Sequence, residues 1–559
     1  MEEQKVLKKK MEPGKMEERA MRKMMNIFAA ALVMLAALGC EKNETLPDNN
    51  QHNGKITLTA VIGNGGTKTS LGTLENGQYP VLWSEGDAIA VINGENVFGF
   101  TLKEGEGGKT KGIFELTDGP AESFDPQQEI KAFYPDSDVN VVSYDGTKIT
   151  YNVSQQQIFV AGSFGNGAMP MAAYRAAGST TALSFDNLFG VLKLQLKGAA
   201  GETVTSIAVT SDKVLNGAAN VSIGASDNSI TLSASDDENK TVTLDCGTDG
   251  KELSTENITE FLISLPPNAT SEKHSLEITV NTKLGNTEKS YTLNTEQAIS
   301  AGMIKKMPVI DLSIAYIENG VYYGDGIALP KSATETLIWA PVNCGYDENH
   351  KYGLLYQWGR KYGQGYDDET PAVVLMNEQL TSADAGSSYD NKNNFYYNNR
   401  DWLNPAVDNL WYNNAQEATT KKTQYDPCPN GWRVPTIEEL VTLIYGLTEG
   451  GSKLGLSSQW TTIEDLNDKY YGMTGFWAYG NTTETSGNKV FLPAAGSRNM
   501  FFSGSVPATA QNRGELADYS SSSVNGEDIM VLAIYRTTSQ AYSYGNARAF
   551  GRSVRCVKE

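Results

Sequence analysis

The sequence predicts a mainly β protein with two tandem β-sandwiches and a C-terminal α+β domain. Up to residue 313, short runs rich in Val, Ile, Thr and aromatic residues follow one another closely, separated by Gly, Asn and Asp. That pattern is typical of sandwiches. From Ile314 the composition changes, because all but one of the 8 Trp and 21 of the 27 Tyr lie beyond that point. A third domain of different construction is therefore expected at 314–559.

The first 40 residues are predicted to be a targeting segment. An apolar run at 27–38 follows basic residues, and at about 18 Å of helix it is too short to cross a hydrocarbon core of about 30 Å. It ends in Ala37-Leu-Gly-Cys40, which resembles the cleavage site of bacterial lipoprotein signals. We expect lipidation at Cys40, an outer-membrane lipid anchor at the cell surface and a polar linker at 41–54. The alternative is a plain secretion signal with an incidental cysteine.

Charge and motif content exclude several classes of function. The 559 residues carry 66 Asp+Glu against 46 Lys+Arg, a net charge of −20, and no Lys/Arg cluster follows residue 40. Phosphate binding needs a basic face, so no nucleic-acid partner is expected. The three His residues are isolated among polar residues, and no nucleophile, zinc, calcium or phosphate-loop motif has the required spacing. We therefore expect no catalytic residue, no metal and no cofactor.

The first sandwich is predicted at 55–175. It opens with the β-rich run at 56–62, which ends in a Gly-rich turn. Further strands are expected at 81–83, 88–92, 97–102, 113–116 and 130–134. Asp145-Gly146 between two β-rich runs predicts a hairpin, because a type I′ turn needs positive φ.

The second sandwich is predicted at 176–313. Its clearest strand is 191–197, where apolar and polar residues alternate strictly. We expect Leu192, Leu194 and Leu196 to share the buried face, and Lys193, Gln195 and Lys197 to face water. Other strands are expected at 206–211, 219–223, 229–234, 241–246, 260–265, 276–281, 291–294 and 307–312.

The third domain has one clear helix and one expected disulfide. Thr436 and Glu439 have the spacing of a capping box, and an apolar stripe predicts a helix over 436–445. Cys428 and Cys556 stand in the two distinctive cysteine stretches of this domain, and in an oxidising compartment they are the natural pair. Pairings with Cys246 or Cys344 are the alternatives.

Four stretches of the first two units resemble the Bacteroidetes fimbrillin family. They are 67–72 (Thr-Lys-Thr-Ser-Leu-Gly), 81–91 with its Val-Leu-Trp, 133–135 (Phe-Tyr-Pro) and 187–194 (Asn-Leu-Phe-Gly-Val-Leu-Lys-Leu). The resemblance implies a lipoprotein pilus subunit of two transthyretin-like sandwiches. It also implies that a trypsin-like protease removes the first strand and that subunits join by strand exchange with other fimbrillin subunits. Processing would fall after Lys68, where the family usually has Arg. The alternative is that 63–72 is a turn that is never cleaved.

The third domain resembles the Fibrobacter succinogenes major paralogous domain. The matching stretches are 339–343 (Trp-Ala-Pro-Val-Asn), 352–360 (Tyr-Gly-Leu-Leu-Tyr-Gln-Trp-Gly-Arg), 428–435 (Cys-Pro-Asn-Gly-Trp-Arg-Val-Pro), 491–496 (Phe-Leu-Pro-Ala-Ala-Gly) and 551–558 (Gly-Arg-Ser-Val-Arg-Cys-Val-Lys). The resemblance implies a C-type lectin-like fold. Asp518 stands in a Tyr-Ser-Ser-Ser stretch where the family usually has Tyr-Trp-Ser-Ser.

One stretch of the third domain is a candidate ligand-binding surface. Residues 391–414 combine aromatic side chains with many asparagines, and aromatic faces stack on sugar rings while amides bond hydroxyls. The alternative is that these aromatic residues fill the core of a loop-rich domain. The candidate residues are Tyr396, Tyr397, Arg400, Asp401, Trp402, Trp411 and Tyr412.

These observations together predict a fimbrial tip adhesin. A removable first strand would let the subunit accept a donor strand, while a third domain after the second sandwich leaves no free strand there to donate. The ligand would be an unknown host or bacterial surface molecule, such as a glycan. The alternative is an outer-membrane lipoprotein that binds glycan or protein directly and never polymerises. An enzyme is the third and least favoured prediction.

Overall fold

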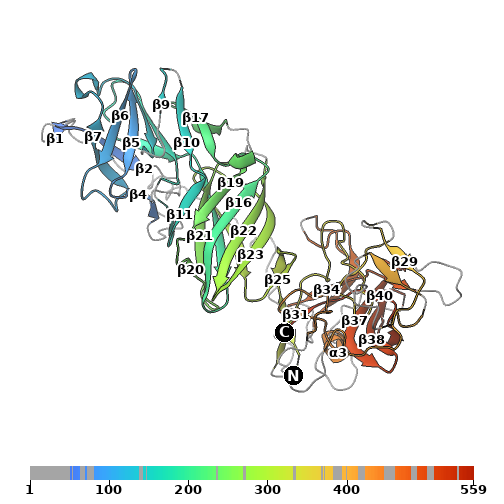
Figure 1. The fold of residues 1–559 in the computed structure, drawn as a ribbon. Helices are drawn as coiled ribbons and strands as arrows, with labels where there is room; N and C mark the ends of the chain where they lie inside the picture. The colour runs from blue at the N-terminus through green and yellow to red at the C-terminus, as the bar shows by residue number, and fades with distance from the viewer. Residues whose placement is uncertain are drawn as a thin grey trace, which may run out of the picture.

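The computed structural model shows three lobes that follow the order of the sequence (Figure 1). The described residues contain one α-helix and two short 3-10 turns, Ala121–Ser123 and Asp237–Lys240. No helix within this part of the chain is long and apolar enough to span a membrane. The described residues are 51–52, 55–62, 70–71, 81–136, 143–146, 148–165, 167–233, 237–267, 272–331, 335–366, 369, 372–381, 393–397, 399–412, 422–445, 460–466, 468–479, 488–499, 509–537 and 540–559.

The main sheet of the first lobe closes on itself. In order around the ring, the strands are β2 (Lys55–Ile62), β14 (Leu183–Asn187), β13 (Met171–Arg175), β8 (Ile130–Tyr134), β5 (Ala88–Asn93), β6 (Asn96–Leu102) and β7 (Lys111–Asp118), and β7 pairs again with β2. The short strand β1 (Gln51–His52) extends β2, and β3 (Ser70–Leu71) pairs with β4 (Val81–Leu82). The first strand of the lobe is therefore bonded on both sides, parallel to β14 and antiparallel to β7.

Alternation along β2 explains why it belongs in this ring. Leu58, Ala60 and Ile62 are buried in the core of the lobe, at 2%, 0% and 9% exposure, while Thr59 and Val61 are half-buried. Opposite them lies Trp83, which is fully buried and makes edge-to-face contacts with aromatic rings from three strands of the ring. The ring therefore closes around one apolar core to which β2 contributes.

Strand pairing crosses the expected boundary between 175 and 176 in both directions. A second sheet of the first lobe consists of β18 (Asn228–Leu232), β17 (Gly217–Ile223), β10 (Ile149–Val153) and β9 (Ser143–Tyr144), in that order. Two of these strands come from beyond residue 176, as does β14. Conversely, β11 (Gln156–Val160) pairs with a strand of the second lobe. The first two lobes are therefore interleaved in sequence.

Two sheets form the second lobe. The larger contains, in order, β12 (Ser163–Phe164), β11, β19 (Thr241–Asp245), β16 (Glu202–Ser211), β22 (His274–Leu284), β23 (Thr287–Gln297), β26 (Val321–Asp325) and β25 (Ala315–Glu318), with β20 (Lys251–Glu252) on β16. The smaller contains β21 (Thr259–Leu265), β15 (Gly190–Lys197) and β24 (Ile304–Asp311). Their inward residues, including Leu192, Leu194 and Leu196, form a common core as predicted.

Lys193, Gln195 and Lys197 of β15 were predicted to face water, and this is wrong for the first two. Lys193 is 6% exposed and Gln195 is 3% exposed, although both lie on the outer face of the strand. β15 is the middle strand of its sheet, and Glu260 of β21 lies over both side chains. The carboxylate of Glu260 is 2.7 Å from Lys193 Nζ and accepts a 3.1 Å hydrogen bond from Gln195 Nε2. A charged cross-strand partner therefore replaces water here.

The hairpin β25–β26 joins the second and third lobes. Asn319 and Gly320 turn it with φ of 52° and 83°, the positive values that a two-residue type I′ turn requires. Alternate residues belong to different cores: Ala315, Ile317 and Tyr322 pack with the second lobe, and Tyr316 and Tyr323 with the third. The hairpin is therefore shared by two lobes and fixes how they meet.

The third lobe is built from small sheets and long loops. The sheets are β27 (Ile327–Pro330), β28 (Thr336–Trp339), β41 (Val557–Lys558) and β31 (Trp432–Arg433); β32 (Thr461–Thr462), β33 (Thr474–Ala478) and β34 (Val490–Pro493); β36 (Thr509–Gln511), β35 (Ser497–Asn499) and β40 (Gly551–Arg552); β37 (Leu516–Asn525), β38 (Asp528–Tyr535) and β39 (Gln540–Ala547); and β29 (Val374–Met376) with β30 (Asn394–Tyr396). Two aromatic-rich cores lie between them.

The helix α3 (Ile437–Tyr445) begins as the sequence predicts. Thr436 N–H donates to Glu439 Oε2 at 2.9 Å, and Glu439 N–H donates to Thr436 Oγ1 at 3.3 Å, so the capping box is confirmed. Arg433 donates two further hydrogen bonds to the same carboxylate, at 2.7 and 2.8 Å. These contacts lower the pKa of Glu439 despite its burial. The apolar face of the helix packs into the second of the two cores.

Candidate functional site

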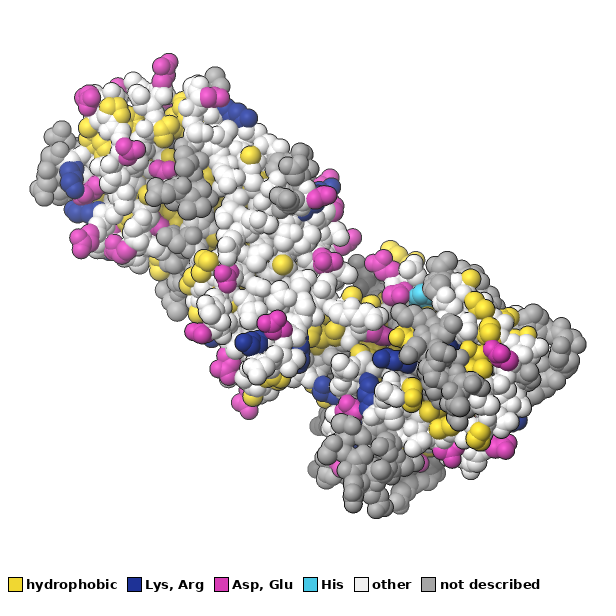
Figure 2. Space-filling model, in the orientation of Figure 1, with side chains coloured by type: hydrophobic (Ala, Val, Ile, Leu, Met, Phe, Trp, Pro, Cys, Tyr) yellow, Lys and Arg dark blue, Asp and Glu magenta, His cyan; other side chains and the backbone are white. Residues whose placement is uncertain are grey.

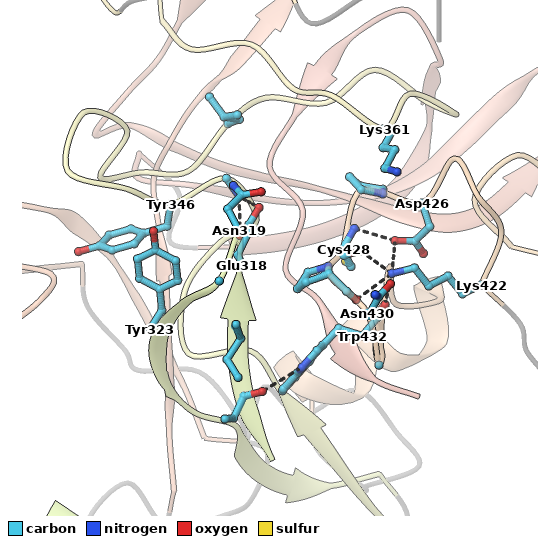
Figure 3. A pocket seen from close by; sticks show the side chains of 18 of the residues that line it. Glu318, Asn319, Tyr323, Tyr346, Lys361, Lys422, Asp426, Cys428, Asn430 and Trp432 are labelled. Carbon is cyan, nitrogen blue, oxygen red and sulfur yellow. Dashed lines mark hydrogen bonds and ion pairs between the residues drawn. The ribbon is translucent and has the colours of Figure 1, made fainter. Parts of the chain in front are cut away.

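A cleft of about 1490 Å³ lies where the second and third lobes meet. One side is the β25–β26 hairpin with the end of the β22–β23 hairpin, and the other is formed by loops of the third lobe at 345–350, 361–365 and 422–432. Figure 3 shows the labelled side chains in two groups, one with Tyr323, Tyr346 and Asn319 and the other with Lys422, Asp426 and Cys428. The cleft is therefore lined by both lobes and by the hairpin that they share.

A pair of tyrosines, one from each side, lines the cleft. The rings of Tyr323 and Tyr346 meet edge to face, with centroids 5.3 Å apart and planes at 86°. Both side chains are half-buried, and Tyr346 donates its hydroxyl hydrogen to the Lys469 carbonyl at 3.2 Å. Exposed Asn319 lies at the turn of the hairpin beside them (Figure 3). Aromatic surface beside an amide suits a polar ligand with apolar faces.

His350 is a second feature of the cleft. Its Nδ1 lies 2.9 and 3.1 Å from the two carboxylate oxygens of Asp347, and the backbone N–H of His350 donates to the same carboxylate at 2.8 Å. The imidazole is 91% buried, and its Nε2 has no hydrogen-bond partner among the described residues. In the tautomer that carries its hydrogen on Nδ1 and donates it to Asp347, Nε2 presents a lone pair that can accept a hydrogen bond.

The 422–432 loop of the cleft is held by a buried Lys–Asp pair. Lys422 Nζ donates to the carbonyls of Cys428, Pro429 and Trp432, the last two at 2.8 and 2.7 Å. Asp426 accepts from the backbone N–H groups of Cys428 and Val434 at 2.8 and 2.9 Å. Burial raises the pKa of Asp426 to about 7 and lowers the pKa of Lys422. Both side chains bond to backbone atoms of the loop, so they stabilise its conformation. We therefore expect other residues of the cleft to contact a ligand.

The predicted pair Cys428 and Cys556 is joined by a disulfide in the structure, with Cα atoms 5.9 Å apart. It ties the loop that lines the cleft to the residue before β41. Cys246 and Cys344 are unpaired, so neither alternative pairing is present. Cys246 is half-buried in the second lobe, and Cys344 is fully buried beside the disulfide.

The candidate surface at 391–414 is mostly core. The prediction of ligand contact is wrong for Tyr396, Trp402 and Trp411, which are 2%, 1% and 0% exposed and cannot reach a ligand. The indole N–H groups of the two tryptophans donate to the carbonyls of Trp358 and Arg360, at 2.7 and 3.3 Å. These rings fill the interior of a domain with little regular structure, which is the alternative that the sequence left open.

The other candidate residues have different surroundings. Asp401 is 8% exposed, accepts from the backbone N–H of Leu403 at 3.0 Å, and burial raises its pKa. Arg400 is exposed and forms an ion pair with Asp528. Tyr397 and Tyr412 are half-buried. None of the candidate residues lines the cleft described above. The lipidation site Cys40 and the processing site Lys68 lie outside the described residues.

Sequence reasoning missed the residues that form the cleft. His350 stands isolated among polar residues in the sequence, yet it is buried against Asp347. The Asn319-Gly320 pair between two β-rich runs is a strong hairpin signal and could have located the junction and its tyrosines. No local pattern indicates that Tyr346 meets Tyr323, because the two residues are far apart in the sequence and meet only in the core of the third lobe.

Comparisons with known proteins give weak structural similarity. No family model and no curated protein sequence matches the chain. Among solved structures, a candidate cell adhesion protein of Bacteroides uniformis is 18% identical at a TM-score of 0.28, covering 46% of this chain and 94% of its own. A fimbrial assembly protein of Parabacteroides distasonis is 14% identical at 0.23, covering 51% and 94%. A fimbrial protein of Bacteroides ovatus is 11% identical at 0.18, covering 90% and 99%. TM-scores this low establish neither a shared fold nor a shared function.

Proposed function

We propose that this protein is a lipid-anchored fimbrial subunit of the cell surface. It accepts a strand from another subunit, occupies the tip of the fibre and presents a binding domain there. In this proposal the first two lobes are the transthyretin-like pilin domains of a fimbrillin, and the third is a C-type lectin-like domain. The observation that carries it is the position of β2. Acidic side chains spread over the face of the first two lobes in Figure 2 match a secreted, soluble surface.

Removal of β2 would open the first lobe on two sides at once. Its residues pair with β14 from Ala60 to Ile62 and with β7 from Thr57 to Val61. Without it, both neighbouring strands would present unpaired N–H and C=O groups beside Phe114 and Phe185, which are fully buried in the intact protein. Such an edge is a template for an extended strand from another chain. Cleavage at Lys68 would therefore create the acceptor that strand exchange needs.

The third lobe favours a subunit at the end of a fibre. β41 pairs with β28 at Trp339 and with β31 at Trp432 and Arg433, and Cys556 beside it is held by the disulfide. This segment is engaged inside its own domain, so it is not available as a donor strand. The intact ring of the first lobe also supports the alternative, a surface lipoprotein that never polymerises, because an uncut β2 leaves no open edge there.

The test is uptake of a labelled strand. We expect protein cut after Lys68 by a trypsin-like protease to bind a fluorescent peptide of residues 55–62, while the Lys68→Gln protein treated in the same way does not. The cut exposes a groove that only an alternating apolar strand fills, so a peptide with Ala60→Asp should fail and one with Thr59→Ser should bind. Fluorescence anisotropy measures uptake, and N-terminal sequencing checks that the chain begins at Thr69. Equal uptake by cut and uncut protein contradicts the proposal.

The binding domain has its own test at the cleft. We expect Tyr323→Ala combined with Tyr346→Ala to reduce attachment of protein-coated beads to target cells by at least about tenfold, as aromatic hot spots do. Tyr397→Ala is the matched control, since it removes a half-buried tyrosine from the stretch that the sequence indicated, outside the cleft. A larger loss with Tyr397→Ala than with the double variant would place the binding surface elsewhere.

A further inference from the structure

Three cysteine sulfurs gather beneath the cleft. The Sγ atoms of Cys344, Cys428 and Cys556 all lie within 4.8 Å of one another, and all three residues are buried. Two are joined as a disulfide and the third is a free thiol. The backbone holds the thiol in place, because the N–H of Cys344 donates to the carbonyl of Val554 at 2.9 Å. The free thiol of Cys344 therefore lies close to both sulfurs of the disulfide.

A chain of hydrogen bonds links the free thiol to the Cys556 sulfur of the disulfide. The Cys344 S–H lies 3.6 Å from Glu318 Oε1 and 3.3 Å from the carbonyl of Pro427. The Tyr316 hydroxyl donates to Glu318 Oε2 at 2.9 Å and lies 3.7 Å from the sulfur of Cys556. The carboxylate of Glu318 therefore connects the attacking sulfur to a hydroxyl that contacts the sulfur that would leave.

We propose that Cys344 exchanges with the Cys428–Cys556 disulfide, producing a Cys344–Cys428 disulfide and a free Cys556 thiol. Glu318 takes the proton of the Cys344 thiol, and the resulting thiolate attacks Cys428 Sγ. The new S–S bond forms with the electron pair of the thiolate, and the pair of the old bond leaves on Cys556. Tyr316 protonates the Cys556 thiolate and recovers a proton from Glu318. One S–S bond breaks and one forms, so no oxidant or reductant is consumed.

The contacts indicate which sulfur leaves. Because all three sulfurs lie within 4.8 Å of one another, they are not collinear, so Cys344 Sγ must shift before it can approach Cys428 Sγ in line with the S–S bond. Among the described residues, the Tyr316 hydroxyl contacts the sulfur of Cys556, and no hydroxyl contacts that of Cys428; a leaving thiolate is stabilised by such a donor. Burial raises the pKa of both Cys344 and Glu318, so the thiolate is scarce and the exchange is slow. The exchanged form would free the residue next to β41 from its covalent tie to the loop. This inference is independent of the proposed fimbrial role.

The direct test is disulfide mapping of the full chain over time. The folded protein is incubated without reductant in mildly alkaline buffer, quenched with acid, alkylated with N-ethylmaleimide and digested with pepsin at low pH. We expect mass spectrometry to detect Cys344–Cys428 linked peptides that increase with time to a constant fraction, with alkylated Cys556 increasing in step. The proposal is overturned if Cys428–Cys556 is the only linkage at every time, with Cys344 alkylated after unfolding.

Two variants test whether Cys344 exchanges with the disulfide or only lies close to it. Tyr316→Phe removes the proton donor to Cys556 and should slow the exchange by about tenfold or more, while Cys246→Ser should leave the rate unchanged. Cys556→Ser keeps the test valid if Tyr316→Phe does not fold, because it leaves Cys344 and Cys428 as a thiol pair. Oxidation of that variant by glutathione disulfide should join them. Two free thiols after oxidation, or a link from Cys428 to Cys246, would contradict the proposal.

Discussion

Replacing Cys428 and Cys556 together by Ala will lower the free energy of unfolding of the third lobe by about 5 kcal/mol. The disulfide closes a loop with a sequence separation of 128 residues, so its loss restores a large chain entropy to the unfolded state. Both sulfurs are also buried in the core around Trp432. Urea unfolding followed by tryptophan fluorescence measures the change, because all but one tryptophan of the chain lies in this part of the sequence.

Both cysteines must be replaced, because Cys344 lies close enough to pair with whichever one remains. The matched control is Cys344→Ser, which keeps the disulfide and changes one buried atom. We expect it to cost far less than the double variant. A midpoint of unfolding that is the same in the double variant and in Cys344→Ser would show that the disulfide contributes no stability.

Trp83→Ala will destabilise the first lobe by about 3–5 kcal/mol, the cost of deleting a large buried aromatic residue. Trp83 is 0% exposed, and its ring lies 4.9, 5.8 and 5.5 Å from the rings of Phe114, Tyr134 and Phe185. These partners come from β7, β8 and β14, so one side chain connects strands around the ring. Amide hydrogen exchange resolved by mass spectrometry measures the effect on peptides of this lobe alone.

Trp83→Phe is the control for this second prediction. The indole N–H of Trp83 is buried without a hydrogen-bond partner among the described residues, and phenylalanine removes that unsatisfied donor while keeping one ring in place. Its cost should therefore be clearly smaller than that of alanine. Equal protection losses in the two variants would mean that ring packing does not hold the sheet together.

Local patterns in the sequence predicted the strands and the helix well. The predicted strand 130–134 matches β8, and the predicted helix agrees with α3 because the capping box is a contact between residues three apart. The inward face of β15 was also predictable, since alternation along one strand places Leu192, Leu194 and Leu196 together. These features depend on neighbours in the chain, and a single sequence contains that information.

Two features were not predictable from the sequence: which distant strands pair, and which side chains cover the outer face of a strand. β2 and β14 are parallel neighbours more than a hundred residues apart, and nothing local to either strand specifies the other. Likewise, alternation says that Lys193 and Gln195 lie on one face of β15, but it does not say that Glu260 covers that face. The aromatic stretch at 391–414 has the composition of a binding surface and of a core alike. Only the packing of Trp402 and Trp411 distinguishes the two.

The β25–β26 hairpin determines how the molecule would carry a mechanical load. A pull on the third lobe reaches Tyr316 and Tyr323 in one core, while Ala315, Ile317 and Tyr322 are anchored in the other. The force therefore passes through two sets of packed side chains on opposite faces of the same strands, in addition to the covalent backbone. Separating the lobes requires one of these two sets of side chains to leave its core, so the joint resists traction through packing as well as through the backbone.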